Sequence, residues 1–319
     1  MKAAPRTVNQ DIVICGQRIP IGAPVVLWDE PPYYDATKTD PRFGPAGPKT
    51  PVGPRYQPGR VRKLPNPAFV AAPKAGAADT RAPDQRSETI DEVLVSGTAR
   101  DPSVLREVVD QFVLHHDACG LSRTCFKVLQ DVRGLSVHFM LDIDGTIYQT
   151  IDLRDTTWHA TKSNRRSIGI EIANIGAYTA RDAWQLEAWY QRDAHGTRIT
   201  FPAHIVETGV RTPGFVGRPA RAHRVLGEIQ GDSLQQFDFT PEQYASLVKL
   251  TRALCREFPK IKPDAPRDEH GFVQTRALTD EAWREFGGIL GHYHVQTNKN
   301  DPGPAFDWEP FLAAVRAQE

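Results

Sequence analysis

The chain has 319 residues, which is enough for one large domain or two modest ones. Lysine and arginine together number 39, as do aspartate and glutamate, so no overall field favours nucleic acid, anionic lipid or an acidic polymer as a partner. No apolar run reaches the roughly 18 residues of a membrane span, and the first residues lack the apolar core of a secretion signal. We therefore expect local recognition of the ligand and no obligate protein partner.

Residues 1–87 form a proline-rich extension. It holds 15 of the 26 prolines, a composition that resists helix interiors and central strands, so we interpret it as an extended surface arm. Two short β-type runs, 11–15 and 24–28, are separated by Gly16 and Gly22 and could pair as a hairpin. Docking of this strand pair on the main domain is favoured over a separate binding module.

Residues 88–319 have the pattern of a packed α/β domain. Apolar periodicity predicts strands at 108–116 and 167–173, a hairpin over 135–151 with Asp-Gly in its turn, and helices at 122–132, 241–258 and 280–286. We expect Thr240 to be the N-cap of the helix at 241–258. Strands interleaved with helices predict a central mixed β-sheet flanked by helices. Residues 178–238 show little periodicity, and we expect an irregular insertion that forms a wall of the substrate groove.

Histidines and one aspartate are distributed as in a hydrolytic metal site. His115 and His116 end a strand of buried character, while His292 and Asp301 flank a loop long enough to fold both around one ion. A catalytic zinc needs three protein ligands and an open fourth position. A histidine pair alone is more often packed or exposed, so the pattern leaves a metal site and packed histidines as two open alternatives.

Five motifs follow one another along residues 105–310. They are VLHHDA at 113–118, SVHFMLDIDGTIYQ at 136–149, TWHA at 157–160, NRRSIGIEIAN at 164–174 and GHYHVQTNKNDPGP at 291–304. In this order they resemble the motifs of the type 2 N-acetylmuramoyl-L-alanine amidases, which share a fold with the peptidoglycan recognition proteins. The resemblance implies zinc-dependent hydrolysis of the amide bond between the lactyl group of N-acetylmuramic acid and L-alanine in peptidoglycan or muropeptides.

The resemblance also implies a ligand set for one Zn²⁺ per chain. It makes His115, His292 and Asp301 the zinc ligands. Asp301 follows His292 by nine residues, whereas relatives often have ten, so the loop must close differently. His294 stands where relatives often have aspartate, and we expect no zinc contact there.

Two residues match the family's catalytic groups. Glu171 alternates with Ile170 and Ile172, which places its carboxylate on the opposite, less bulky face of the strand. The resemblance makes Glu171 the general base and Lys299 the donor to the oxyanion of the tetrahedral intermediate.

Other motif positions match the family's groove or its disulfide. The resemblance assigns substrate contacts to a set of polar and aromatic residues: His116, His138, Trp158, His159 and Asn164. Cys119 and Cys125 have the spacing of the disulfide in peptidoglycan recognition proteins. A disulfide there would imply an oxidising location, and we expect the cell envelope (periplasm) or the exterior, including a phage-borne route, although no signal is visible.

Three alternatives remain open. A module that binds peptidoglycan without cleaving it is disfavoured because such proteins typically lose the third ligand, whereas this chain retains Asp301 and Glu171. A cytosolic amidase that recycles anhydromuropeptides agrees with the absent signal but not with the expected disulfide. A zinc-stapled structural domain is disfavoured because structural sites are usually closed by four Cys or His ligands.

Overall fold

The computed structural model describes residues 8–43, 49–51, 53–69, 82 and 85–317. The remaining positions of the expected extension 1–87 lie outside the described residues. Among the described residues, no helix combines the length and the apolar character needed to cross a membrane.

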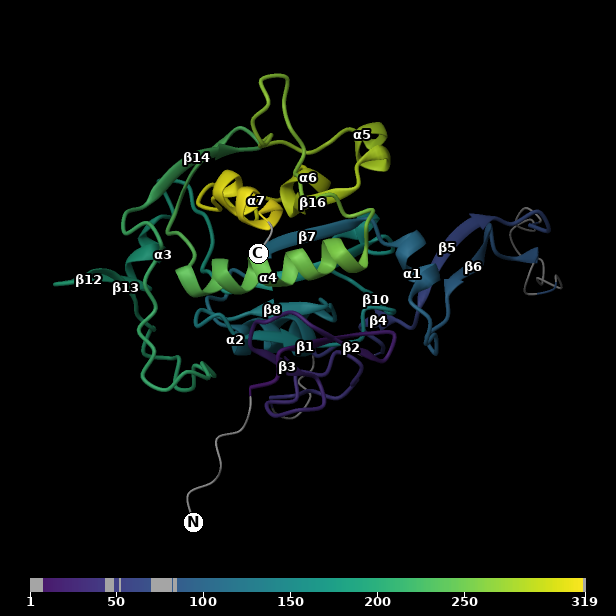
Figure 1. Ribbon diagram of the computed structural model, residues 1–319, viewed down its shortest axis with the longest axis horizontal. Coiled ribbons are helices and arrows are strands. Elements are labelled where there is room, and N and C mark those ends of the chain that lie inside the picture. The colour runs from purple at the N-terminus through teal and green to yellow at the C-terminus, as the bar shows by residue number, and fades with distance from the viewer. Residues whose placement is uncertain (1–7, 44–48, 52, 70–81, 83–84, 318–319) are drawn as a thin grey trace, which may run out of the picture.

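A six-stranded mixed sheet forms the centre of the fold (Figure 1). Its order is β16 (Gly288–Gly291), β7 (Gln111–His116), β11 (Ser167–Ile172), β8 (Phe139–Leu141), β9 (Ile147–Gln149) and β3 (Val25–Leu27). The first four strands are parallel, β9 returns antiparallel to β8, and β3 lies parallel to β9. The α/β class and the expected hairpin are therefore confirmed.

Helices α4 (Pro241–Glu257) and α7 (Trp308–Arg316) cover one face of this sheet (Figure 1). Thr240 begins α4 as expected: its hydroxyl accepts the N–H of Gln243, whose side chain accepts the N–H of Thr240. The buried core between sheet and helices includes Phe112 and Ile170 from the strands and Leu250 from α4. The expected strand 108–116 begins only at Gln111, because Val108 is the last residue of α1 (Ser103–Val108).

The opposite face of the sheet is covered over only part of its area. α2 (Ser122–Lys127) continues into a π-helical segment, η2 (Val128–Arg133), and both pack on Met140 and Tyr148. Three shorter elements lie in the connections between strands: η3 (Thr161–Ser163), α5 (Asp280–Glu285) and α6 (His292–Val295). Side chains from β7 and β11 on this face therefore remain available for a cavity.

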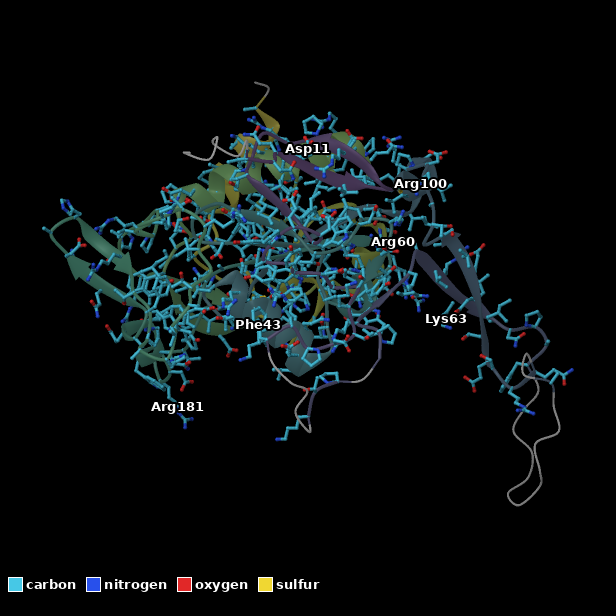
Figure 2. All side chains as sticks on the ribbon, turned by 90° about the horizontal axis from the view of Figure 1, so that it is seen from below. Asp11, Phe43, Arg60, Lys63, Arg100 and Arg181 are labelled. Carbon is cyan, nitrogen blue, oxygen red and sulfur yellow. The ribbon has the colours of Figure 1, made fainter. Side chains whose placement is uncertain are left out.

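The proline-rich segment is built into the fold rather than laid over it. β1 (Asp11–Ile14) pairs with β2 (Gln17–Pro20), because Cys15 and Gly16 both adopt positive φ, 50° and 75°, and form a tight turn. The run 24–28, expected to pair with 11–15, instead contributes β3 to the central sheet. β4 (Tyr56–Gln57) pairs with β10 (Thr156–Thr157), and β5 (Arg60–Pro65) pairs with β6 (Thr89–Val95) in an arm that leaves the body (Figure 2).

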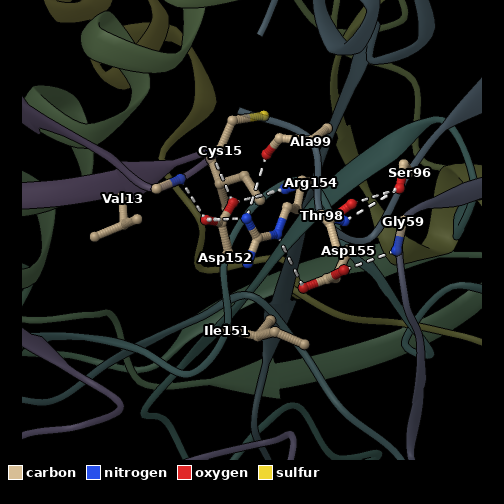
Figure 3. A network of polar contacts seen from close by, with 12 residues as sticks. Val13, Cys15, Gly59, Ser96, Thr98, Ala99, Ile151, Asp152, Arg154 and Asp155 are labelled. Carbon is tan, nitrogen blue, oxygen red and sulfur yellow. Dashed lines mark hydrogen bonds and ion pairs between the residues drawn. The ribbon is translucent and has the colours of Figure 1, made fainter. Parts of the chain in front are cut away.

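Carboxylates of the 152–155 loop hold this segment in place (Figure 3). Asp152 accepts the backbone N–H groups of Cys15 and Gly16 at 2.8 and 2.7 Å, and Asp155 accepts that of Gly59 at 2.7 Å. Carboxylate acceptors make these bonds charge-assisted, and both aspartates are buried, so the bonds fix the segment against the main body.

Regular structure occupies much of the expected irregular insertion at 178–238. It contains α3 (Trp184–Glu187) and two hairpins, β12 (Tyr190–Asp193) with β13 (Gly196–Ile199) and β14 (Val225–Ile229) with β15 (Asp232–Gln236). Gln230 and Gly231 make the β14–β15 turn at positive φ. Strands this short, with many exposed side chains, leave no clear apolar alternation in the sequence.

Candidate active site

Three ionisable side chains converge where β7 and β16 end. His115 is near the end of β7, His292 begins α6 directly after β16, and Asp301 lies on the loop beyond. β16 runs parallel to β7 in register, so the two C-terminal ends, and with them both histidines, meet at one edge. Asp301 Oδ2 lies 2.7 Å from His115 Nδ1 and 3.0 Å from His292 Nδ1.

This cluster fits a zinc ion. One donor atom from each residue lies within 4.8 Å of the others, and two imidazoles with a carboxylate match the ligand chemistry of a three-ligand catalytic site. Burial, with the charge of His292, lowers the pKa of His115 to about 4. Burial opposes ionisation of Asp301, but His292 and His115 hold its pKa well below the usual range. Neutral His115 and ionised Asp301 are the forms that bind metal.

A cavity of about 400 Å³ opens beside the cluster, and Glu171 lines it. Glu171 is the register partner of His115 on the adjacent parallel strand, so both side chains project from the same face of the sheet. Burial, together with the charges of Asp301 and Asp117, raises the pKa of Glu171 well above its usual value. A more basic carboxylate beside the cluster suits proton transfer.

Lys299 and His116 also line the cavity. Lys299 comes from the loop that carries Asp301, and its charge acts on Glu171 and His115. Neither ring nitrogen of His116 has a hydrogen-bond partner among the described residues. Gly176, at φ 103°, makes room for this ring, since a Cβ there would lie 2.9 Å from His116 Cε1.

His159 reaches the cluster from the side of β11. Its Nδ1 lies 3.0 Å from His115 Nε2, and its Nε2 lies 3.2 Å from the Ser167 hydroxyl. Gly169 permits this position, because a Cβ there would lie 2.5 Å from His159 Cε1. His159 lines the cavity, but its nitrogens face protein groups. It therefore contacts the candidate ligand His115 rather than open groove.

The other expected groove residues lie away from the cavity. His138 is fully buried: its Nδ1 accepts the Gly169 N–H at 3.1 Å, so its Nε2 donates to the Asp155 carbonyl at 3.0 Å. Asn164 accepts the N–H groups of His159 and Ala160 through Oδ1. Trp158 is half-buried and does not line the cavity. The structure therefore gives none of His138, Trp158 and Asn164 a place on the cavity wall.

The family profile described as N-acetylmuramoyl-L-alanine amidase matches residues 105–198 and 210–304, which is more than half of the chain. The chain belongs to this family. The match confirms the resemblance found in the five sequence motifs, and it leaves the segment before residue 105 outside the family region.

Individual proteins that resemble this amidase-family chain share little sequence identity with it. The 1,6-anhydro-N-acetylmuramyl-L-alanine amidase AmpD of Haemophilus influenzae is 23% identical over 184 residues, which are 57% of this chain and 59% of that protein. The complex of E. coli AmiD with anhydro-N-acetylmuramic acid-L-Ala-D-gamma-Glu-L-Lys has 18% identity and a TM-score of 0.37, covering 65% of this chain and 57% of that one. The Clostridium intestinale endolysin LysCS has 16% identity and a TM-score of 0.34, covering 66% and 86%. The chain thus spans less than two thirds of the first two relatives, and the family assignment rests on the profile match.

The disulfide expected in this amidase-family chain is absent, and we correct that expectation. Cys119 and Cys125 are free thiols. Cys125 is buried in α2, Cys119 packs on the same apolar cluster, and burial raises the pKa of both thiols. A thiol must ionise to react, so this setting opposes oxidation. Without this disulfide, the two cysteines do not indicate an oxidising location.

Several residues that line this cavity were not predicted as site residues, among them four that are polar or charged: Asp117, Arg133, Gln230 and Asp232. Asp117 directly follows the histidine pair, so its place in the motif was an available signal. Its Oδ1 accepts the N–H groups of Cys119, Gly120 and Asn174, while burial raises its pKa to about 7. Gln230 comes from the β14–β15 turn and Asp232 begins β15, and no local pattern in the sequence marked either residue.

Proposed function

We propose that the chain hydrolyses the amide bond between the lactyl group of N-acetylmuramic acid and L-alanine of the peptidoglycan stem peptide. One observation carries the proposal: the cluster of His115, His292 and Asp301 shares a cavity with Glu171 and Lys299 in a chain of the amidase family. A structural zinc site would be closed by four ligands, whereas this one has three and faces open space.

Each residue of the site has a separate role in the proposed reaction. His115, His292 and Asp301 would hold one zinc ion, which supplies Lewis-acid chemistry by acidifying water and polarising a carbonyl. Glu171 accepts the proton of the attacking water and returns a proton to the leaving amine of L-alanine. Lys299 donates a hydrogen bond to the carbonyl oxygen as that oxygen gains charge.

The test is digestion of purified sacculi followed by mass spectrometry of the soluble products. We expect released stem peptides with a free L-alanine amino terminus, and glycan strands of unchanged length. After exhaustive chelation, no stem peptides should be released. Zinc should restore the activity. Full activity in protein shown to be free of metal would refute zinc dependence, and cleavage at any other bond would refute the proposed substrate bond.

A second candidate, recycling of anhydromuropeptides in the cytosol, is favoured by two observations. The relative AmpD carries the name of a 1,6-anhydro-N-acetylmuramyl-L-alanine amidase, and Cys119 and Cys125 are free. Rates on intact sacculi and on soluble 1,6-anhydromuropeptide separate the two. Preference for sacculi places the reaction in the envelope or outside the cell, whereas activity confined to the anhydro compound places it with cytosolic recycling.

A further inference from the structure

Arg60 is a fully buried arginine at the base of the β5–β6 arm, outside the family region (Figure 2). Its Nη1 donates to the carbonyls of Ser167 at 2.9 Å and Asn164 at 3.2 Å, and its Nη2 donates to that of Leu153 at 2.8 Å. Within the described part of the chain no carboxylate forms a hydrogen bond with it. Its Nη2 also lies 3.3 Å from Nε2 of His138, so the guanidinium contacts main-chain carbonyls and one imidazole rather than a carboxylate.

Two of these carbonyls belong to the residues that hold His159. The Asn164 side chain accepts the His159 N–H at 3.0 Å, and the Ser167 hydroxyl lies 3.2 Å from His159 Nε2. Arg60 thus fixes the main chain of both residues whose side chains fix His159. No other described arginine has this arrangement.

His159 in turn contacts the candidate ligand His115 through a hydrogen bond. If His115 Nδ1 binds the metal, its Nε2 carries the proton and donates to His159 Nδ1, 3.0 Å away. His159 then has its own proton on Nε2 and donates to Ser167. A hydrogen bond to the second nitrogen of a metal-binding histidine fixes its tautomer and ring orientation.

A buried arginine is a costly means of filling space, because an aliphatic side chain would fill it without removing a charge from water. Burial lowers the pKa of Arg60 only to about 10, so it remains charged at neutral pH. A planar donor can hold several carbonyls of one turn at once, which a methionine of similar length cannot do.

We propose that Arg60 is a positioning residue of the zinc site, acting through Asn164, Ser167 and His159 on His115. The inference rests on the proposed zinc function, and it adds the N-terminal segment to the machinery of the site.

The experiment compares Arg60→Met with Arg55→Met in the full chain. Arg55 is a matched control: it is 1% exposed, comes from the same segment, and donates to the carbonyls of Gln130 and Thr39 at 2.7 and 2.8 Å. Its guanidinium touches none of the residues that hold His159. The zinc dissociation constant is measured by competition with a chromophoric chelator, and thermal stability is measured in parallel.

We expect both variants to lose stability, but only Arg60→Met to weaken zinc binding, by about 10–100-fold. Arg60→Lys should recover part of that loss. Should Arg60→Met fail to fold, Ser167→Ala removes only the hydroxyl at His159 and should weaken zinc binding by about 10-fold. Equal zinc affinity in the Arg60 and Arg55 variants, or wild-type affinity in Ser167→Ala, would overturn the inference. Absence of zinc binding in the wild-type chain would instead refute the proposed zinc function.

Discussion

Replacing Gly169 by alanine tests whether His159 must sit where the structure places it. The backbone of β11 at Gly169 does not require glycine, since its φ lies outside the left-handed region. Its Cβ, however, would lie 2.5 Å from both Cε1 and Nδ1 of His159. Carbon atoms in contact prefer about 3.5–4.0 Å, so the ring must move by about 1 Å. A hydrogen bond of 3.0 Å to His115 does not survive such a shift.

The expected result of Gly169→Ala is therefore twofold. Overpacking should lower the free energy of unfolding by about 1–3 kcal/mol, and loss of the contact to His115 should weaken zinc binding by about 10–100-fold. Urea denaturation of the metal-free protein and chelator competition measure the two effects.

The double variant Gly169→Ala with His159→Ala supplies the control. Removing the ring removes the clash, so the cost of the added methyl group should fall to nearly zero in this background, which is a coupling of about 1–3 kcal/mol. Zinc binding should remain weak, because the hydrogen bond between His115 Nε2 and His159 is then lost. If Gly169→Ala alone has wild-type stability and wild-type zinc affinity, His159 does not occupy the described position and the reasoning fails.

Four further substitutions test the roles in the cavity. His115→Ala should abolish stoichiometric zinc, measured by elemental analysis, whereas His116→Ala next to it should retain most of the metal; loss of zinc in His116→Ala alone would reverse the assignment. Glu171→Gln should keep zinc and lower turnover on sacculi by about 10²–10⁴-fold. Burial raises the pKa of Glu171, so its ionised form opposes folding at neutral pH, and the metal-free Gln variant should be at least as stable as the wild type in thermal unfolding. Lys299→Ala should slow single-turnover hydrolysis by about 10²–10³-fold with zinc content unchanged; an unaltered rate would remove Lys299 from the mechanism.

The sequence was most informative where a local rule determines the structure. Alternation with the isoleucines predicted the face on which Glu171 lies, and β11 places it beside His115. The capping pattern at Thr240 predicted the start of α4. These inferences succeeded because strand periodicity and helix capping act over a few residues.

Local patterns could not separate motif residues that serve the cavity from those that support it. His138 and His159 both match family motifs in the sequence. His138 is nevertheless fully buried, whereas His159 contacts His115. The role of Arg60 depends on carbonyls about a hundred residues later in the chain. Pairing of β3 with β9 likewise joins segments far apart, which no short-range propensity specifies.

The three residues of β3 determine what lies at the rim of the central sheet. β9 pairs with β8 on one side and with β3 on the other, so its backbone groups are covered on both sides. A chain shortened to the family-matched region would expose one side of β9 as a template for a strand from a second copy. The N-terminal segment thus protects the molecule against self-association through its own sheet edge, and it does so with a strand too short to offer much of a template itself.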